Sequence, residues 1–307
     1  MLVLVLQRLQ LIVGKDQKMG ILCAILSLPI SVLLVRWLMK KKTENPFEKG
    51  DVRRLVLAGM LSMVVASIVT LLILFARAYR LIGIDTLKLW MSNPDPETIK
   101  NSLEEIKSRS SNQTYLSTFA GTFLSVGLVE ELSRFLFIRL STGKKRFAKT
   151  WLDLVICGGI IGVGFQLLED ITYVNGNLIT AIFRAVTPFH FTFGAIMGFF
   201  IGKALEWGKK GYHIPAVLVP ALLHTLFDSS ISALTMDDLY IILVLASALL
   251  LIGLTVFMII KINKWAKLQP IQEAQMEDLT ADLGSQSFPF TQGRETMEAE
   301  RYNPVGR

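Results

Sequence analysis

Ionisable side chains occur inside several long apolar segments of the chain. In chain order they are Glu130, Glu131, Glu169, Asp170, His190, His224 and Asp228. A charge at the centre of a bilayer costs at least about 2.5–3.5 kcal/mol. Several such charges are tolerable only if they face one another inside a helix bundle. The sequence therefore predicts one shared polar site.

Helical spacing pairs these residues with second polar groups. Residues four apart lie on the same face of a helix, which places Arg134 one turn from Glu130 and Asp228 one turn from His224. The second group of each pair can orient the first. Small residues at the same interval let helices approach closely, as a compact site requires. Such glycines occur near two of the polar positions, namely Gly158 with Gly162 and Gly194 with Gly198.

The residue types indicate hydrolysis by an activated water molecule. Two histidines and a carboxylate on separate helices can bind zinc and leave a position for water, while another glutamate is the general base. We assign the metal-ligand role to Glu169, His190 and His224. We assign catalytic roles to Glu130, Glu131, Arg134 and Asp228. Because the sequence has no HExxH motif, a metal-free alternative stays open, in which Glu130 activates water and a histidine stabilises the oxyanion.

Several polar residues of the chain also have simpler interpretations. Arg134 and Glu130 could form a buried ion pair that is only structural. Asp170 is expected to point away from its neighbour, toward a helix cap or water. His213 stands at a helix start and is expected to be an interfacial residue without a catalytic part.

The composition indicates an integral membrane protein. Of the 307 residues, 52% are hydrophobic and 19% are charged, whereas soluble domains contain about 45–50% and about 25%. The formal net charge of +7 could suggest a nucleic-acid partner, but the basic residues gather at the ends of apolar segments. Membrane topology explains that placement better. Cys23 and Cys157 both lie in apolar segments and indicate no disulfide framework.

Long apolar runs predict an all-α bundle of about seven spanning helices in the cell membrane. Their expected ranges are 20–39, 55–82, 115–140, 152–174, 178–205, 212–234 and 239–262. Alternation of basic loops predicts an outside N-terminus and a cytoplasmic C-terminus. The expected divisions are 1–114, with an interfacial segment, two spans and an outer loop; 115–262, a five-helix catalytic core; and 263–307, a flexible cytoplasmic tail.

Four ordered motifs between residues 124 and 229 resemble the PrsW family of intramembrane proteases, which is related to the CAAX-protease and bacteriocin-processing superfamily. The segment 130–134 resembles an EExxK-type motif, with Arg134 where Lys is usual. The segment 164–173 resembles a GFxxxENxxY motif, with Asp170 where Asn is common. A third segment, with Arg184, then His190, then Gly198, resembles the family's segment of Arg, His and Gly in that order. The last segment, in which Asp228 follows His224 by four residues, resembles an HxxxD or HxxxN motif.

This resemblance implies a membrane-embedded peptidase that hydrolyses a peptide bond within or beside the bilayer. In the better-known members of the family the substrate is a single-pass anti-sigma factor, so a single-pass membrane protein is the expected partner. A CAAX-type prenyl-protein endopeptidase is an alternative, although the FxxxEDxxY segment favours the PrsW branch. A transporter or proton-relay protein, or an inactive binding protein, is a further alternative because intramembrane Glu and His also mark ion pathways.

Overall fold

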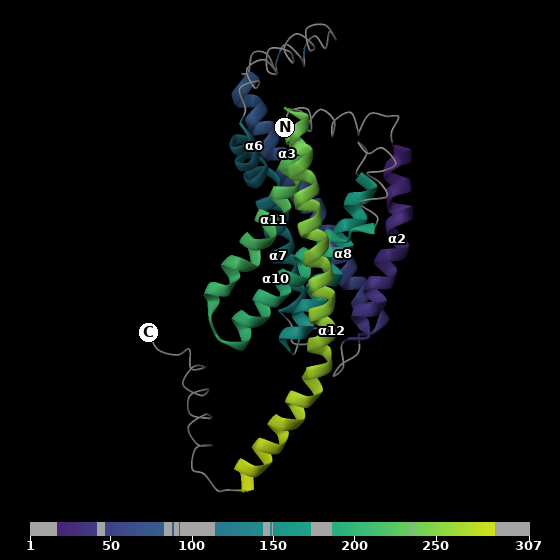
Figure 1. The fold of residues 1–307 in the computed structure, drawn as a ribbon, viewed down its shortest axis with the longest axis vertical. Helices are drawn as coiled ribbons and strands as arrows, with labels where there is room; N and C mark the ends of the chain where they lie inside the picture. Colours follow the sequence, from purple (N-terminus) through teal and green to yellow (C-terminus); the bar gives the residue numbers. More distant parts are fainter. Residues whose placement is uncertain are drawn as a thin grey trace. The chain divides into compact units, whose positions relative to one another are not determined.

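The computed structural model describes residues 17–41, 47–82, 88, 92, 114–143, 148, 150–172, 186–234 and 236–285. The chain divides into two compact units, Met1–Ile262 and Asn263–Arg307, and the first unit contains all the residues discussed above as functional. Every secondary-structure element in the described part is helical (Figure 1). The predicted all-α class is therefore confirmed for that part.

The helices follow one another along the chain in the following order: α2 (Gln17–Met39), α3 (Lys49–Ile82), α6 (Tyr115–Thr122), the π-helical turn η1 (Phe123–Gly127), α7 (Leu128–Thr142), α8 (Trp151–Thr172), α10 (Phe189–Glu206), η2 (Lys210–Tyr212), α11 (His213–Ala233), η3 (Asp238–Tyr240) and α12 (Ile241–Ser285). Helix α8 is central, because α2, α3, α7 and α10 all pack against it. Helix α11 packs against both α7 and α10.

Glycines allow α8 and α10 to approach each other closely. A Cβ added to Gly158 would overlap the carbonyl oxygen of Gly194, and a Cβ on Gly194 would overlap that of Gly158. The carbonyl oxygen of His190 lies in the same way against Gly162. Packing of backbone on backbone replaces the side-chain layer that separates most helices. The predicted role of these glycines is confirmed.

A π-helical turn divides the long helix that runs from α6 into α7. The backbone N–H of Leu128 donates to the carbonyl of Phe123, five residues earlier rather than four. A π-turn contains one extra residue and often occurs at functional sites. This one ends shortly before Glu130 and Glu131, and the sequence did not indicate it.

Four helices of the described part are long and apolar enough to cross a membrane: Gly50–Arg77, Trp151–Ile171, Lys210–Ala233 and Asp238–Leu268. A shorter apolar stretch, Ile25–Met39, lies in α2. Helix α7, which contains Glu130, Glu131, Arg134 and Arg139, is not among these four. The total of seven spans and the orientation of the termini stay predictions.

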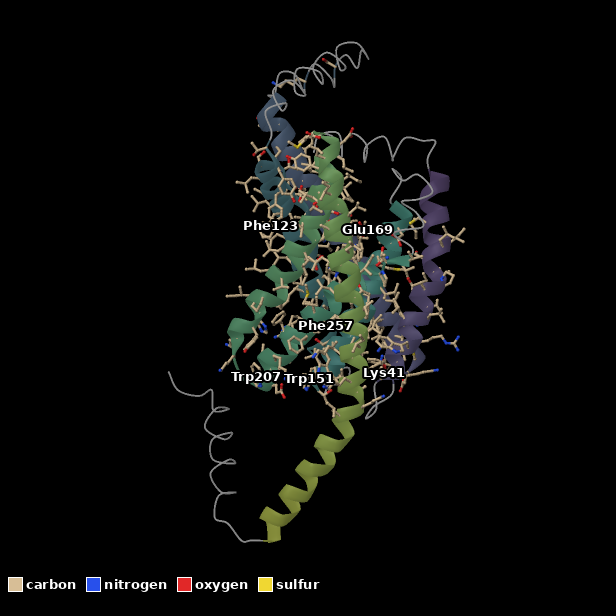
Figure 2. The ribbon with its side chains drawn as sticks, viewed as in Figure 1. Lys41, Phe123, Trp151, Glu169, Trp207 and Phe257 are labelled. Atoms are coloured by element: carbon tan, nitrogen blue, oxygen red, sulfur yellow. The ribbon has the colours of Figure 1, made fainter. Side chains whose placement is uncertain are left out.

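Aromatic and basic residues mark one end of the first unit. Figure 2 shows Lys41, Trp151 and Trp207 near one level, whereas Glu169 lies farther along the bundle. The ammonium group of Lys203 lies 4.6 Å from the ring centroid of Trp151 and 5.0 Å from that of Trp207. Tryptophan and lysine are typical of membrane–water interfaces. This arrangement therefore suits an interfacial level, with Glu169 away from it.

Two expected helix boundaries were wrong. The predicted span 178–205 is not one continuous helix, because Thr187 and Pro188 are not helical and α10 begins at Phe189. Proline lacks an N–H and disfavours helix at the residue before it. The last helix was expected to end at 262 but continues to Ser285, where Glu, Gln, Ala and Leu are common and favour helix. The N-terminal interfacial segment, most of the outer loop, Tyr173 and Arg184 lie outside the described residues.

Candidate active site

Four helices bring ionisable side chains to one interior place. Helix α7 contributes Glu130, Glu131 and Arg134, α8 contributes Glu169, α10 contributes His190, and α11 contributes His224 and Asp228. All are buried except Asp228, whose side chain is 33% exposed. Charges attract and repel one another more strongly in such an interior than at a wet surface. Electrostatic interactions within the site are therefore strong, and Asp228 is its most exposed member.

Arg134 is the central donor of the site. Its guanidinium forms a buried ion pair with Glu131, and its Nη2 lies 2.8 Å from Nδ1 of His190. A guanidinium can only donate, so Nδ1 of His190 accepts and the ring proton resides on Nε2. That Nε2 lies 2.6 Å from Oε2 of Glu169. Arg134 and Glu169 thus fix both the tautomer and the direction of His190.

His224 lies among three carboxylates. Its Nδ1 is 3.0 Å from Oε1 of Glu131, and its Nε2 is 3.4 Å from Oδ2 of Asp228 and 3.7 Å from Oε2 of Glu130. Carboxylates on both sides of an imidazole hold the ring plane in one orientation. The predicted pairing of His224 with Asp228 one turn later is present.

Aromatic rings enclose the two histidines. The rings of His190 and His224 meet edge to face with centroids 5.1 Å apart. Phe165 lies 4.9 Å from His190 and also 4.1 Å below the guanidinium carbon of Arg134. Phe193 stacks on His224 at 5.4 Å. These rings restrict motion of the polar groups without competing for their hydrogen bonds.

These contacts form one continuous network. Its members, in order from α8 to α11, are Glu169, His190, Arg134, Glu131, His224 and Asp228. Carboxylates can accept a proton from water, while Arg and His N–H groups can stabilise a developing oxyanion. The network thus contains the groups that hydrolysis of an acyl bond requires.

The structure brings together all seven residues that the sequence assigned to the site, with one change of partner. Helical spacing predicted that Arg134 would face Glu130, whereas its ion pair is with Glu131, three residues earlier. Asp170 was expected to face a helix cap or water; it is fully buried, which rules out water, while the cap stays a prediction. His213 begins α11, about three turns from His224, and its ring packs against Phe135 at 5.7 Å.

Phe165 and Phe193 are wall residues of the site to which the sequence analysis assigned no role, although Phe165 belongs to the GFxxxEDxxY segment. Their spacing could have indicated them, because Phe165 precedes Glu169 by one turn and Phe193 follows His190 by nearly one turn. Residues at these intervals share a helix face. An aromatic residue one turn from a buried polar residue is therefore a useful signal for the walls of such a site.

Three of the residues could hold a metal ion. Glu131, His190 and His224 each offer a ligand atom, and these atoms all lie within 4.8 Å of one another. Carboxylate oxygen and imidazole nitrogen are normal zinc ligands, so the donors fit in type and in spacing. The carboxylate of this set is Glu131, whereas the predicted ligand Glu169 lies 2.6 Å from Nε2 of His190 and stays a prediction. Arg134 contacts Glu131 and His190, and Nδ1 of His190 has only one lone pair, so a metal ion bound there would have to displace the guanidinium from His190.

The chain matches a known protein family. A family model described as PrsW family intramembrane metalloprotease matches residues 51–260. The chain belongs to the PrsW family. The resemblance inferred from the four motifs is confirmed, and the match begins within α3, well before the first motif. Together with the long apolar helices, membership of the PrsW family identifies a multi-pass membrane protein.

Curated relatives named Protease PrsW match part of the chain. The protein from Bacillus subtilis (strain 168) is 32% identical over 124 residues, covering 38% of this chain and 57% of the relative. The protein from Clostridioides difficile (strain 630) is 34% identical over 118 residues, covering 35% and 50%. The chain thus spans about half the length of the curated PrsW relatives it matches. No solved structure matches it.

Proposed function

We propose that this PrsW-family chain is a membrane-embedded endopeptidase that hydrolyses a peptide bond of a membrane-protein substrate. The observation that carries the proposal is the buried network that joins carboxylates, histidines and an arginine from four helices. Such groups are costly inside a membrane bundle and are normally kept for function. The relatives named Protease PrsW support the same activity.

Glu130 is the proposed general base. Both oxygens of Glu131 are engaged, Oε2 by Arg134 and Oε1 by His224, and a carboxylate paired with a guanidinium is a weak base. Glu130 lies beside the Nε2 edge of His224. It takes a proton from water as the water oxygen bonds to the scissile carbonyl carbon. It then passes that proton to the amine nitrogen as the C–N bond breaks.

Glu131, His190 and His224 are the proposed holders of a metal ion, whose fit to these ligand atoms is described above. A bound zinc ion would acidify a water molecule and polarise the scissile carbonyl. The chain's own residues keep separate tasks in either case, with Arg134 neutralising Glu131 and Asp228 orienting His224.

The zinc assignment can be tested on purified protein. Elemental analysis should find close to one metal per chain, and the His190→Ala, His224→Ala double variant should lose it. If the purified protein cleaves its substrate although it contains no metal, and chelators do not inhibit it, the zinc assignment is excluded. In that case the metal-free alternative would hold, with the two histidines hydrogen-bonding the water and the oxyanion.

The proposed substrates are single-pass membrane proteins, including anti-sigma factors, as the family resemblance implies. A site enclosed by membrane helices suits a substrate that arrives within the bilayer rather than from bulk water. A proton relay is less well supported, because Arg134 stands in the middle of the network and a guanidinium does not release its proton.

Co-expression with candidate single-pass membrane proteins tests this proposal. Cleavage fragments should form with the wild type and be absent with Glu130→Ala. Glu206→Gln is the matched control, because Glu206 pairs with Lys203 at an exposed position away from the network. Fragments that persist with Glu130→Ala would refute the proposed chemistry.

A further inference from the structure

Helix α3 is tied to the helix of the glutamate pair by hydrogen bonds that cross between the two helices. Arg77 Nη1 donates to the Gly121 carbonyl at 3.5 Å, Thr70 Oγ1 donates to the Ser125 carbonyl at 2.9 Å, and Ser133 Oγ donates to the Ser62 carbonyl at 2.6 Å. The partners run in opposite order along the two helices. Two of the three bonds therefore bracket Glu130 and Glu131, one before the pair and one after it.

The α3 face that makes these contacts is buried and polar. Ser62, Ala66 and Thr70 follow one another at intervals of one turn and are each at most 3% exposed. Leu72 and Phe75, on the other side of the helix, are exposed. Hydroxyls inside a membrane bundle persist where a partner satisfies them. Helix α3 thus has one lipid-suited side and one side adapted to α7.

The bond from Thr70 reaches the π-helical turn. Ser125 lies within Phe123–Gly127, where the backbone ladder shifts from four-residue to five-residue spacing. The extra residue of a π-turn rotates the following helix by about 100° relative to the preceding one. The directions of Glu130 and Glu131 therefore depend on whether this turn is maintained.

Helix α3 also holds the floor of the site. Met63 and Ala66 pack against Phe165, the ring that lies below Arg134. A Cβ on Gly59 would overlap the carbonyl oxygen of Ile161 in α8, so α3 and α8 are in backbone contact. Helix α3 thus contacts both α7 and α8, which carry Glu130, Glu131 and Glu169.

We propose that Thr70 and Ser133 are positioning residues, through which α3 sets the π-turn and the directions of Glu130 and Glu131. The motifs of the sequence assign no role to α3. The hydrogen bonds and the burial of its inner face give it one. This inference rests on the proposed function only in so far as the two glutamates take part in hydrolysis.

The test uses two substitutions at one position and a matched control. Thr70→Val keeps the size but removes the hydroxyl, whereas Thr70→Ser keeps the hydroxyl. The control is Thr142→Val, because Thr142 is a buried threonine of α7 whose hydroxyl bonds within its own helix, to the Ile138 carbonyl at 2.6 Å. Ser133→Ala removes the second link independently.

The measurements are hydrogen–deuterium exchange of residues 121–131 in lipid nanodiscs, and kcat and KM on a cleaved substrate. Thr70→Val should speed exchange of this segment about fivefold to tenfold and lower kcat about tenfold with KM unchanged. Ser133→Ala should act in the same direction. Thr70→Ser should restore both values, and Thr142→Val should change neither.

Exchange in Thr70→Val that equals that in Thr142→Val would overturn the inference, whatever happens to cleavage. If residues 121–131 exchange faster in Thr70→Val but its kcat is unchanged, the positioning role of Thr70 is also overturned. If the wild type cleaves no membrane protein while Thr70→Val still speeds exchange, the proposed function fails. In that case the link from α3 to the glutamate pair stands.

Discussion

Helices α8 and α12 are both long and apolar, but they occupy opposite environments in the first unit. In the most apolar stretch of α8 83% of the residues are buried, compared with 28% in α12. Helix α12 is the more apolar of the two, and Leu245 and Leu249 are among its exposed residues. Apolar character therefore does not tell which helix lies inside a membrane bundle.

The difference between the two helices lies in their small and polar residues. Helix α8 has glycines that meet the backbone of α10 and carries Glu169 into the network. In α12, Gly253 has open space around it. In lipid, where the tails are as apolar as leucine, close packing and hydrogen bonds decide which helices associate. Chemistry should therefore depend on the α8–α10 side and tolerate change on the α12 side.

The largest effects are expected where α10 and α11 carry their histidines into the network. His190→Ala and His224→Ala should each lower kcat/KM by about 100-fold or more, because each removes a group beside the reacting atoms. His213→Ala, at the start of α11, should leave cleavage unchanged. Cleavage assays on nanodisc-reconstituted variants check this. Equal losses at all three histidines would break the comparison.

The next effect concerns helix packing. Gly158→Ala should destabilise the protein by about 1–3 kcal/mol or more, because its Cβ meets the rigid carbonyl of Gly194. Gly253→Ala should be neutral or stabilise by about 0.5–1 kcal/mol, because alanine favours helix over glycine. Thermal unfolding in detergent, followed by circular dichroism, measures both. A stable Gly158→Ala protein would show that the close approach of α8 and α10 is not required.

A smaller effect is expected at Asp228, the most exposed member of the site. Asp228→Asn should lower kcat by about tenfold, because Asp228 orients His224 but is not needed for the proton transfer itself. The variant should retain its bound metal, if the wild type contains one. If Asp228→Asn lost as much activity as His224→Ala, Asp228 would instead belong among the reacting groups.

The smallest effect concerns the hydrogen bond between α10 and α12. Thr192 Oγ1 lies 2.7 Å from Thr255 Oγ1, and such bonds between membrane helices contribute about 0.6 kcal/mol on average. Thr255→Val should therefore lower the unfolding temperature slightly and leave kcat unchanged. A large loss of kcat would indicate that α12 helps to shape the site.

Much of the bundle and most of the site residues could be predicted from the sequence. Apolar length indicated the helices, and the cost of burying Glu131 and His190 indicated that they would meet. The partner of Arg134 could not be predicted, because one residue of register decides between Glu130 and Glu131. Both glutamates share a face of α7 with Arg134, so the choice depends on contacts from the neighbouring helices.

Contacts between helices were the other feature beyond prediction. The spacing of Gly158 and Gly162 indicated a close approach but not that α10 would be the partner. Thr70 looked like an ordinary residue of an apolar span, because its role depends on which carbonyl it meets. Side-chain partners across helices follow from rotation and depth, and neither can be read from periodicity alone.

The central claim is that hydrolysis depends on the buried glutamate Glu130. The most direct measurement is cleavage of a single-pass substrate by purified protein in nanodiscs, in water enriched in ¹⁸O. Wild type and Glu206→Gln should release a fragment whose new carboxylate contains ¹⁸O, whereas an equally folded Glu130→Gln variant should release none. Cleavage by Glu130→Gln at the wild-type rate would contradict the account.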